Sequence, residues 1–148
     1  MKKLLLLLLP CLPAMATPPP TKLVRQFTQA LLDKRVPDSV LVARFMCPDL
    51  LLQHGNPRAD QARTMLHYWR IEVQKQTQLS PRQLRRAPVV PSRQVPHPNF
   101  HMLGGEENTY VLQLDKQSNW YFLVHGQQVN SGLLLNQGGE AYFVDFCR

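Results

Sequence analysis

The stretch TYVLQLDKQSNWYFLVHGQQVNSGLLLNQGGEAYFVDF, residues 109–146, decides the fold class. Its first part and its third part alternate apolar residues with less apolar ones, the period of a half-buried β-strand: Tyr110, Leu112 and Leu114, then Val129, Ser131, Leu133 and Leu135. Between them, residues 120–124 are apolar on both faces, which indicates a central strand covered on both sides. Residues 141–146 form the last predicted strand.

Short turn segments separate these strands. They lie at residues 115–119, at Gly126 and at residues 136–139, and they are rich in Gly, Asn and Asp. Links this short force neighbouring strands to run antiparallel. We therefore predict an antiparallel β-meander at the C-terminus.

Amphipathic helices are predicted before the sheet. One spans residues 21–34, capped by Thr21, because apolar residues recur at three- and four-residue steps: Leu23, Val24, Phe27, Ala30 and Leu31. A shorter helix begins at Asp38 or Ser39 and carries Val40, Leu41 and Phe45. Pro48 ends or bends it, and residues 49–52 add a further turn.

The longest helix has the clearest start signal. Asn56 is suited to the cap, Pro57 to the first helical position, and Asp60 to the positive end of the helix dipole. One apolar stripe follows, made of Ala62, Met65, Leu66, Trp69 and Val73. Trp69 is either a pocket wall or plain core packing, and the second role is the commoner one.

Residues 79–100 differ in kind because five prolines exclude a continuous helix or a central strand. A short helix is expected over Ser80–Arg86, with Ser80 as its cap and Pro81 next to it. Val89–Val95 is suited to an edge strand. If it does not form one, the segment is an extended, exposed arm. Helices first and a meander afterwards make the fold class α+β.

This order of elements resembles the cystatin-like α+β roll of the NTF2-like superfamily, in which a curved antiparallel sheet wraps the longest helix. The runs that carry the resemblance are WYFL at 120–123, VNSG at 129–132 and GGEAYF at 138–143. They are similar to small secreted bacterial proteins of that shape. The resemblance rests on element order over residues 21–146, and no functional residue is carried over from it.

The N-terminus has the features of a signal peptide over residues 1–16. Lys2 and Lys3 form a positive start, six leucines form the apolar region, and Ala14-Met15-Ala16 supplies the small residues of a cleavage site. A membrane anchor would need a longer apolar run, and a lipoprotein would use Cys11, which follows a proline. We expect an exported protein, secreted or periplasmic, whose residues 17–148 form one α+β domain without a membrane span.

Cleavage would leave two cysteines, Cys47 and Cys147. In an oxidising compartment such a pair is most simply a disulfide. Two unpaired buried thiols are the alternative. Because no Cys-x-x-Cys spacing exists, a redox-active pair is disfavoured.

The excess positive charge is confined to one segment. Loss of Lys2 and Lys3 lowers the net charge from +7 to +5, and residues 73–105 hold five basic residues and no acidic one. Helical spacing would align guanidinium groups for phosphate or carboxylate partners, and the anion-binding candidates are Arg82, Arg85, Arg86 and Arg93. The alternative is a loop kept soluble by arginines. Nucleic acid is disfavoured because Phe100 is the only aromatic residue nearby.

Catalytic and metal sites find little support. His97 and His101 stand four residues apart, but Pro98 opposes a helix there, so we interpret both as loop histidines without a metal. His125, Ser131 and Asp145 are the ingredients of a hydrolase triad without its usual turn motif. A nucleophilic Cys47 with His54 is disfavoured relative to the disulfide, and Glu106-Glu107 is expected to be a solvated loop.

These observations favour a non-catalytic binding or interaction domain of the periplasm or cell exterior. Its ligand would lie between the longest helix and the concave sheet, with Trp69 and Trp120 as pocket walls, and no cofactor is called for. One alternative is an envelope-associated protein that docks on anionic surfaces through residues 82–93. Another is a small hydrolase or isomerase that uses the same pocket.

Overall fold

The computed structural model describes residues 19–96, 101–114 and 118–148. The predicted signal peptide at residues 1–16, with Cys11, and also His97 lie outside the described residues. Within the described ranges the fold class is α+β, as the sequence predicts. The helices come first: α1 (Pro20–Leu32), α2 (Asp38–Phe45), α3 (Pro48–Leu51), α4 (Pro57–Gln76) and α5 (Pro81–Arg86). None of these helices combines the length and the apolar character that crossing a bilayer requires.

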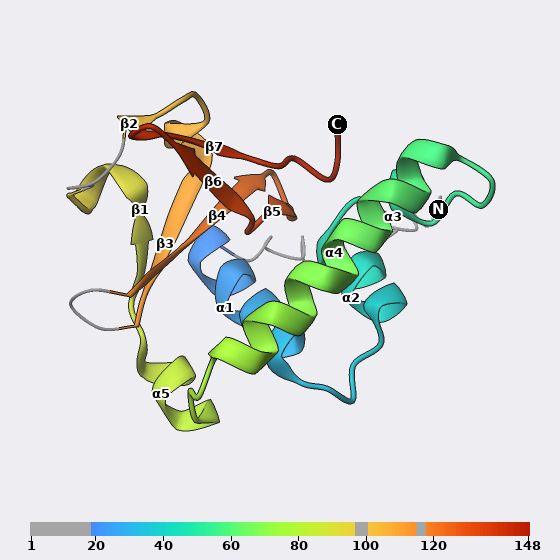
Figure 1. Cartoon of the computed structure of the whole chain (residues 1–148). Helices are drawn as coiled ribbons and strands as arrows, with labels where there is room; N and C mark the ends of the chain where they lie inside the picture. The colour runs from blue at the N-terminus through green and yellow to red at the C-terminus, as the bar shows by residue number, and fades with distance from the viewer. Residues whose placement is uncertain (1–18, 97–100, 115–117) are drawn as a thin grey trace, which may run out of the picture.

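The strands form two sheets (Figure 1). The larger sheet has the order β1-β3-β4-β5, with β1 (Val89–Pro91), β3 (Thr109–Gln113), β4 (Asn119–His125) and β5 (Gln128–Ser131). The smaller has the order β2-β7-β6, with β2 (His101–Met102), β6 (Leu134–Gln137) and β7 (Glu140–Phe143). The strands joined by tight turns pair antiparallel, as predicted, whereas β2 lies parallel to β7.

The predicted continuous alternation from Val129 to Leu135 is wrong as a single strand. The chain leaves the larger sheet after Ser131 and enters the smaller one at Leu134. The link passes through Gly132, where a Cβ atom would lie 2.6 Å from Trp69 Cη2 and 2.7 Å from Trp69 Cζ2. The indole of α4 therefore occupies the space that a side chain at position 132 would need.

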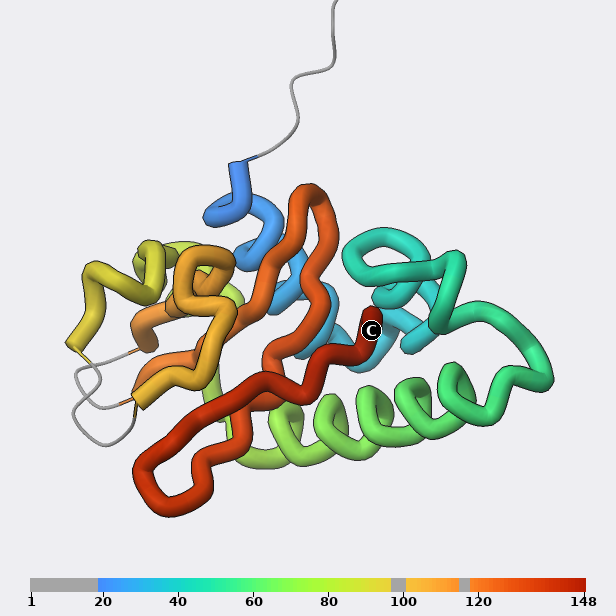
Figure 2. The backbone as a smooth tube through the Cα atoms, turned by 90° about the horizontal axis from the view of Figure 1, so that it is seen from above, coloured from blue at the N-terminus to red at the C-terminus, as the bar shows by residue number. Residues whose placement is uncertain are grey.

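Helix α1 is the element around which the core forms. It packs on α2 and α4 and also on strands β1, β3, β4 and β5 (Figure 1). All five apolar residues predicted to face inward from this helix are buried. The sheet thus packs mainly on α1, whereas the longest helix, α4, lies along one side of the molecule (Figure 2).

Helix starts follow local sequence closely, with one exception. The Asn56 side chain accepts hydrogen bonds from the backbone N–H groups of Arg58 and Ala59 at the start of α4. Ser80 and Gln83 form a reciprocal capping box at the start of α5. The predicted Thr21 cap is wrong, because the extended residue Pro19 precedes α1 and Pro20 is its first residue.

The proline-rich segment follows the edge of the larger sheet only briefly. Strand β1 is an edge strand but ends at Pro91, and Ser92–Gln94 turns into a 3₁₀ helix, η1. The predicted strand to Val95 is therefore too long. A second 3₁₀ turn, η2 (Glu106–Asn108), precedes β3. The turn η1 contacts β3 and η2 contacts β4, and Val111, Leu123 and Met102 are buried outside the main core cluster.

A disulfide joins Cys47, at the junction of α2 and α3, to Cys147 next to the C-terminus. Their Cα atoms lie 5.7 Å apart, and 100 positions separate them in sequence. Figure 2 shows the segment after β7 returning toward α2 and α3. The pairing predicted from the cysteine count is thus present in the structure.

Candidate functional site

A pocket of about 310 Å³ lies between α4, β4 and the link from β5 to β6. We call it the tryptophan pocket, because both tryptophans of the chain line it. Trp69 comes from α4 and Trp120 from β4, so the structure brings the two predicted wall residues to one cavity. The remaining lining residues are Val73, Asn119, Tyr121, Phe122, Gly132, Leu133 and Leu134.

The Trp69 side chain is held by packing on several sides. Its ring stacks against Phe27 of α1 with 6.5 Å between centroids, and it lies 6.3 Å from the ring of Phe146. Gly132 presents bare backbone to the same indole. Because neighbours from both the helical layer and the sheet restrain the ring, this wall of the pocket is preformed.

Trp120 is placed by the strand ladder. It pairs with Leu112 across β3 and β4, and it packs half-buried against the main core. Strand alternation puts Phe122 on the same face, and Phe122 contacts Phe27 edge to face at 5.9 Å. The second wall thus rests on the most buried part of the sheet.

The chemistry of this pocket is mainly apolar. Among its described lining residues, Tyr121 is the one titratable side chain. Burial raises the pKa of the Tyr121 phenol, and a hydrogen bond with Asn119 acts in the opposite direction. Tyr121 therefore stays neutral at physiological pH. Such a lining can exclude water and stack against an apolar ligand.

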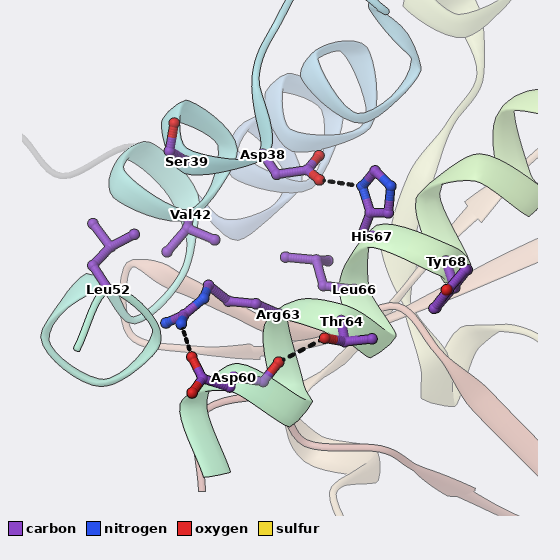
Figure 3. Close-up of a pocket in the computed structure, with 10 residues that line it drawn as sticks. All are labelled: Asp38, Ser39, Val42, Leu52, Asp60, Arg63, Thr64, Leu66, His67 and Tyr68. Carbon is purple, nitrogen blue, oxygen red and sulfur yellow. Dashed lines mark hydrogen bonds and ion pairs between the residues drawn. The ribbon is translucent and has the colours of Figure 1, made fainter. Parts of the chain in front are cut away.

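A second cavity, the α2–α4 groove, has a volume of about 440 Å³ (Figure 3). Most of its polar groups already have partners within the molecule. His67 Nδ1 lies 2.6 Å from Asp38 Oδ2, Arg63 pairs with Asp60, and the Thr64 hydroxyl donates to the Asp60 carbonyl at 2.8 Å (Figure 3). Tyr68 is 65% exposed at its rim. These internal pairings leave the groove with little unsatisfied polarity to offer a ligand.

Arg70 of α4 is a buried charge that the sequence analysis did not single out. It is 6% exposed, and its guanidinium donates to the carbonyl oxygens of Leu31 (3.0 Å), Asp33 (2.8 Å) and Val36 (2.6 Å) and to the Asp38 carboxylate. These carbonyls lie in the last turn of α1 and just beyond it, where intrahelical donors are missing. A cation is also favourable at that end of the helix dipole. Arg70 therefore joins α1, α2 and α4.

The pKa of Asp38 reflects this joint. Partial burial raises it, but the hydrogen bonds from Arg70 and His67 lower it, and the lowering prevails. The signal that could have revealed the joint is spacing. Arg70 follows Leu66 by four residues and Ala59 by eleven, so it lies on the same face of α4 as these two buried residues.

The hydrolase triad does not assemble. Ser131 is buried, and its hydroxyl accepts from the Leu133 N–H at 3.0 Å. Asp145 accepts hydrogen bonds from Asn130 and from the Cys147 N–H. In the strand ladder His125 pairs with Gln128, whereas Leu123 is the residue opposite Ser131. The three residues thus have separate surroundings, and we assign them no joint chemistry.

The other singled-out residues lie apart from the tryptophan pocket. His101 is exposed in β2, His54 is exposed in the turn before α4, and Glu106 and Glu107 are exposed in η2. Cys47 is committed to its disulfide. Within the described ranges, no three His, Cys, Asp or Glu side chains cluster as metal ligands would.

The four candidate anion-binding arginines are all exposed. Arg82, Arg85 and Arg86 lie on α5 and Arg93 on η1, and within the described part of the chain none forms an ion pair. Arg85 also lines a third cavity of about 460 Å³ between the end of α1 and α5, which we call the α1–α5 groove. Lys34 and Arg35 line the same groove.

Comparison of the chain with protein-family models, with curated proteins and with solved structures finds no match. The functional conclusion therefore rests on the site itself. The tryptophan pocket offers uncommitted apolar surface on fixed walls, whereas the α2–α4 groove consists largely of groups already paired. The tryptophan pocket is the better candidate for a ligand site.

Proposed function

We propose that this protein is an exported, non-catalytic binding domain of the periplasm or cell exterior, which holds a small apolar or aromatic ligand in the tryptophan pocket. One observation carries the proposal. Two tryptophans that are 51 positions apart in sequence line one pocket of about 310 Å³ whose other lining is mainly apolar. Its volume is at the lower end of the range of small-molecule sites.

Several features support this function over catalysis. A hydrolase or isomerase needs convergent titratable groups, and the described lining offers the neutral Tyr121 alone. The pocket also lies between the longest helix and the sheet, which is the position predicted for a ligand from the sequence. The leader sequence and the disulfide support an oxidising compartment outside the cytosol.

The experiment is a titration of the mature chain, residues 17–148, with the neutral fluorescent probe N-phenyl-1-naphthylamine. Because both tryptophans line the site, a probe bound there lies next to both energy-transfer donors, and the variants below locate the binding site. We expect saturable transfer, and we expect Trp120→Ala to weaken binding at least tenfold, since it removes one wall. A neutral probe avoids attraction to the basic segment.

Tyr68→Ala is the matched control, because Tyr68 is an exposed aromatic residue on α4 that does not line this pocket. It should bind the probe like the parent protein. Equal loss in both variants, or probe binding without energy transfer, would refute the proposed site. Circular dichroism of each variant verifies that it is folded.

A further inference from the structure

The α1–α5 groove combines an apolar floor with a cationic rim. Leu84 of α5 is buried, Leu32 and Leu79 are half-buried, and all three line the groove. Lys34, Arg35 and Arg85 also line it and are exposed to solvent. This arrangement differs from the tryptophan pocket, where no cationic side chain contributes to the described lining.

The positive charge at this rim is largely uncompensated. Asp33 is the one acidic residue among the lining, and Arg35 binds it through Nε at 3.0 Å and Nη2 at 2.9 Å. The hydrogen bonds from Arg35 lower the pKa of Asp33 to about 2, so this carboxylate stays charged and paired. Lys34 and Arg85 form no ion pair within the described residues, and Arg82 and Arg86 on the same helix add to the field.

The negative end of the α1 dipole does not cancel this charge. An anion is normally disfavoured near the free carbonyls at a helix C-terminus. Here the Leu31 carbonyl accepts from Arg70 Nε at 3.0 Å and from Gln74 Nε2 at 2.7 Å, and the Asp33 carbonyl accepts from Arg70. Side chains of α4 thus satisfy the free carbonyl groups at the end of α1.

The walls of the groove are held in place by contacts behind them. Arg25 of α1 donates to the Ala87 carbonyl, at the end of α5, at 3.0 Å. Leu84 and Ala87 are buried in the main core cluster. A groove whose walls are fixed before binding loses little conformational freedom when a ligand enters.

We propose that the α1–α5 groove binds an anionic amphiphile, a lipid with one phosphate headgroup. Its acyl chain would lie over Leu32, Leu79 and Leu84, and its phosphate would lie between Lys34 and Arg85. Inorganic phosphate would contact only the cationic rim, and a neutral lipid would contact only the apolar floor. This site is independent of the ligand proposed for the tryptophan pocket.

The test is a calorimetric titration of the mature chain with monododecyl phosphate below its micelle concentration. Inorganic phosphate and neutral dodecyl maltoside serve as the two single-feature probes. We expect saturable one-to-one binding of monododecyl phosphate and at least tenfold weaker binding of either of the others. Binding of inorganic phosphate at equal strength would overturn the amphiphile proposal.

Charge-removing variants locate the site. Lys34→Gln with Arg85→Gln should weaken monododecyl phosphate binding by about thirtyfold, since each removes one cation from the headgroup position. The matched control is Arg44→Gln with Arg58→Gln, which makes the same charge change at exposed positions of α2 and α4. It should weaken binding less than threefold. Equal weakening by both double variants would show nonspecific attraction and overturn the proposal.

Two further variants separate this site from the tryptophan pocket. Leu79→Asn places an amide on the apolar floor and should weaken the dodecyl phosphate while leaving the neutral naphthylamine probe unaffected. Trp120→Ala should do the reverse. If Trp120→Ala abolishes dodecyl phosphate binding and Leu79→Asn does not, the amphiphile occupies the tryptophan pocket and the α1–α5 groove is excluded.

Discussion

Two consecutive residues of opposite chemistry, Trp69 and Arg70, join helix α4 to the elements around it. Arg70 joins it to α1 and α2 through hydrogen bonds to backbone carbonyls and to Asp38, and we call this contact the polar joint. Trp69 joins it to the β5–β6 link through Gly132, to the C-terminal segment through Phe146 and to α1 through Phe27, and we call this contact the apolar joint. The polar joint satisfies its donors internally, whereas the apolar joint leaves the tryptophan pocket beside it.

The difference shows how a small domain separates rigidity from binding. Directional hydrogen bonds fix the angle between helices and leave no unpaired donor or acceptor for a ligand. Apolar contact is not directional, so it can hold two layers together while a cavity remains at their border. We therefore expect damage to the polar joint to lower stability and damage to the apolar joint to change binding as well.

The largest effect should come from removing the disulfide, which ties the C-terminal segment after β7 to the junction of α2 and α3. Cys47→Ala with Cys147→Ala should lower the free energy of unfolding by about 4–5 kcal/mol, because the unfolded chain regains a loop of about 100 residues. Urea denaturation of residues 17–148 measures this. A change below about 1 kcal/mol would show that the disulfide does not constrain the chain as we infer.

Breaking the polar joint should have the next largest effect. Arg70→Met should lower the free energy of unfolding by about 3 kcal/mol, because it leaves Asp38 and several carbonyl groups without their buried donor. The Asp38 side chain is 34% exposed, so water partly compensates it and the cost stays at the lower end of the range for such pairs.

The control for Arg70→Met is Lys75→Met, which removes an exposed cation paired with Glu72 on the same helix. It should change stability by less than about 0.5 kcal/mol. Equal effects of the two variants in urea denaturation would contradict the role given to Arg70.

Overfilling the apolar joint should cost less stability but change the pocket. Gly132→Ala places a Cβ against the Trp69 indole and should lower stability by about 1–3 kcal/mol, with a shifted tryptophan emission spectrum. Gly138→Ala is the control, because a Cβ there meets nothing within 4 Å. Although its positive φ makes that change costly too, the tryptophan spectrum should stay that of the parent protein. Identical spectra for both variants would argue against the close packing at Gly132.

The smallest effect concerns the acid sensitivity of the polar joint. The pKa of Asp38 is lowered in the folded state, so the stability it contributes is complete above the unfolded value of 3.8 and is lost as the pH falls through the folded pKa. The stability difference between the parent protein and Asp38→Asn should therefore be largest near neutral pH and shrink below pH 3.8. Urea denaturation at several pH values measures it, and a difference that grows on acidification would contradict the assignment.

Sequence reasoning succeeded where the decisive forces are local. Asn56 with Pro57 and Ser80 with Pro81 mark helix starts because a cap acts on backbone groups only two or three residues away. The alternation of apolar residues likewise predicted β3, the run that is apolar on both faces predicted β4, and the order of helices and strands predicted the α+β class. The cysteine count predicted the pair that the structure joins.

Sequence reasoning failed where distant residues decide the outcome. The break at Gly132 depends on an indole from α4, 63 positions earlier, and no local pattern announces it. Arg70 was not singled out from the sequence, because its partners lie on distant segments, at the end of α1, in the turn after it and at the start of α2. The two tryptophan walls of the pocket were predicted from the sequence, but its other lining residues could be identified only from the structure.

The most direct test of the binding function is a pair of two-dimensional ¹⁵N–¹H NMR spectra, recorded with and without N-phenyl-1-naphthylamine. The chain contributes two indole N–H signals, one from Trp69 and one from Trp120. We predict that both shift together with the backbone signals of β4 and of the β5–β6 link, while the signals of α5 stay in place. Unmoved indole signals, with the shifts gathered elsewhere on the molecule, would contradict the assignment of the tryptophan pocket as the binding site.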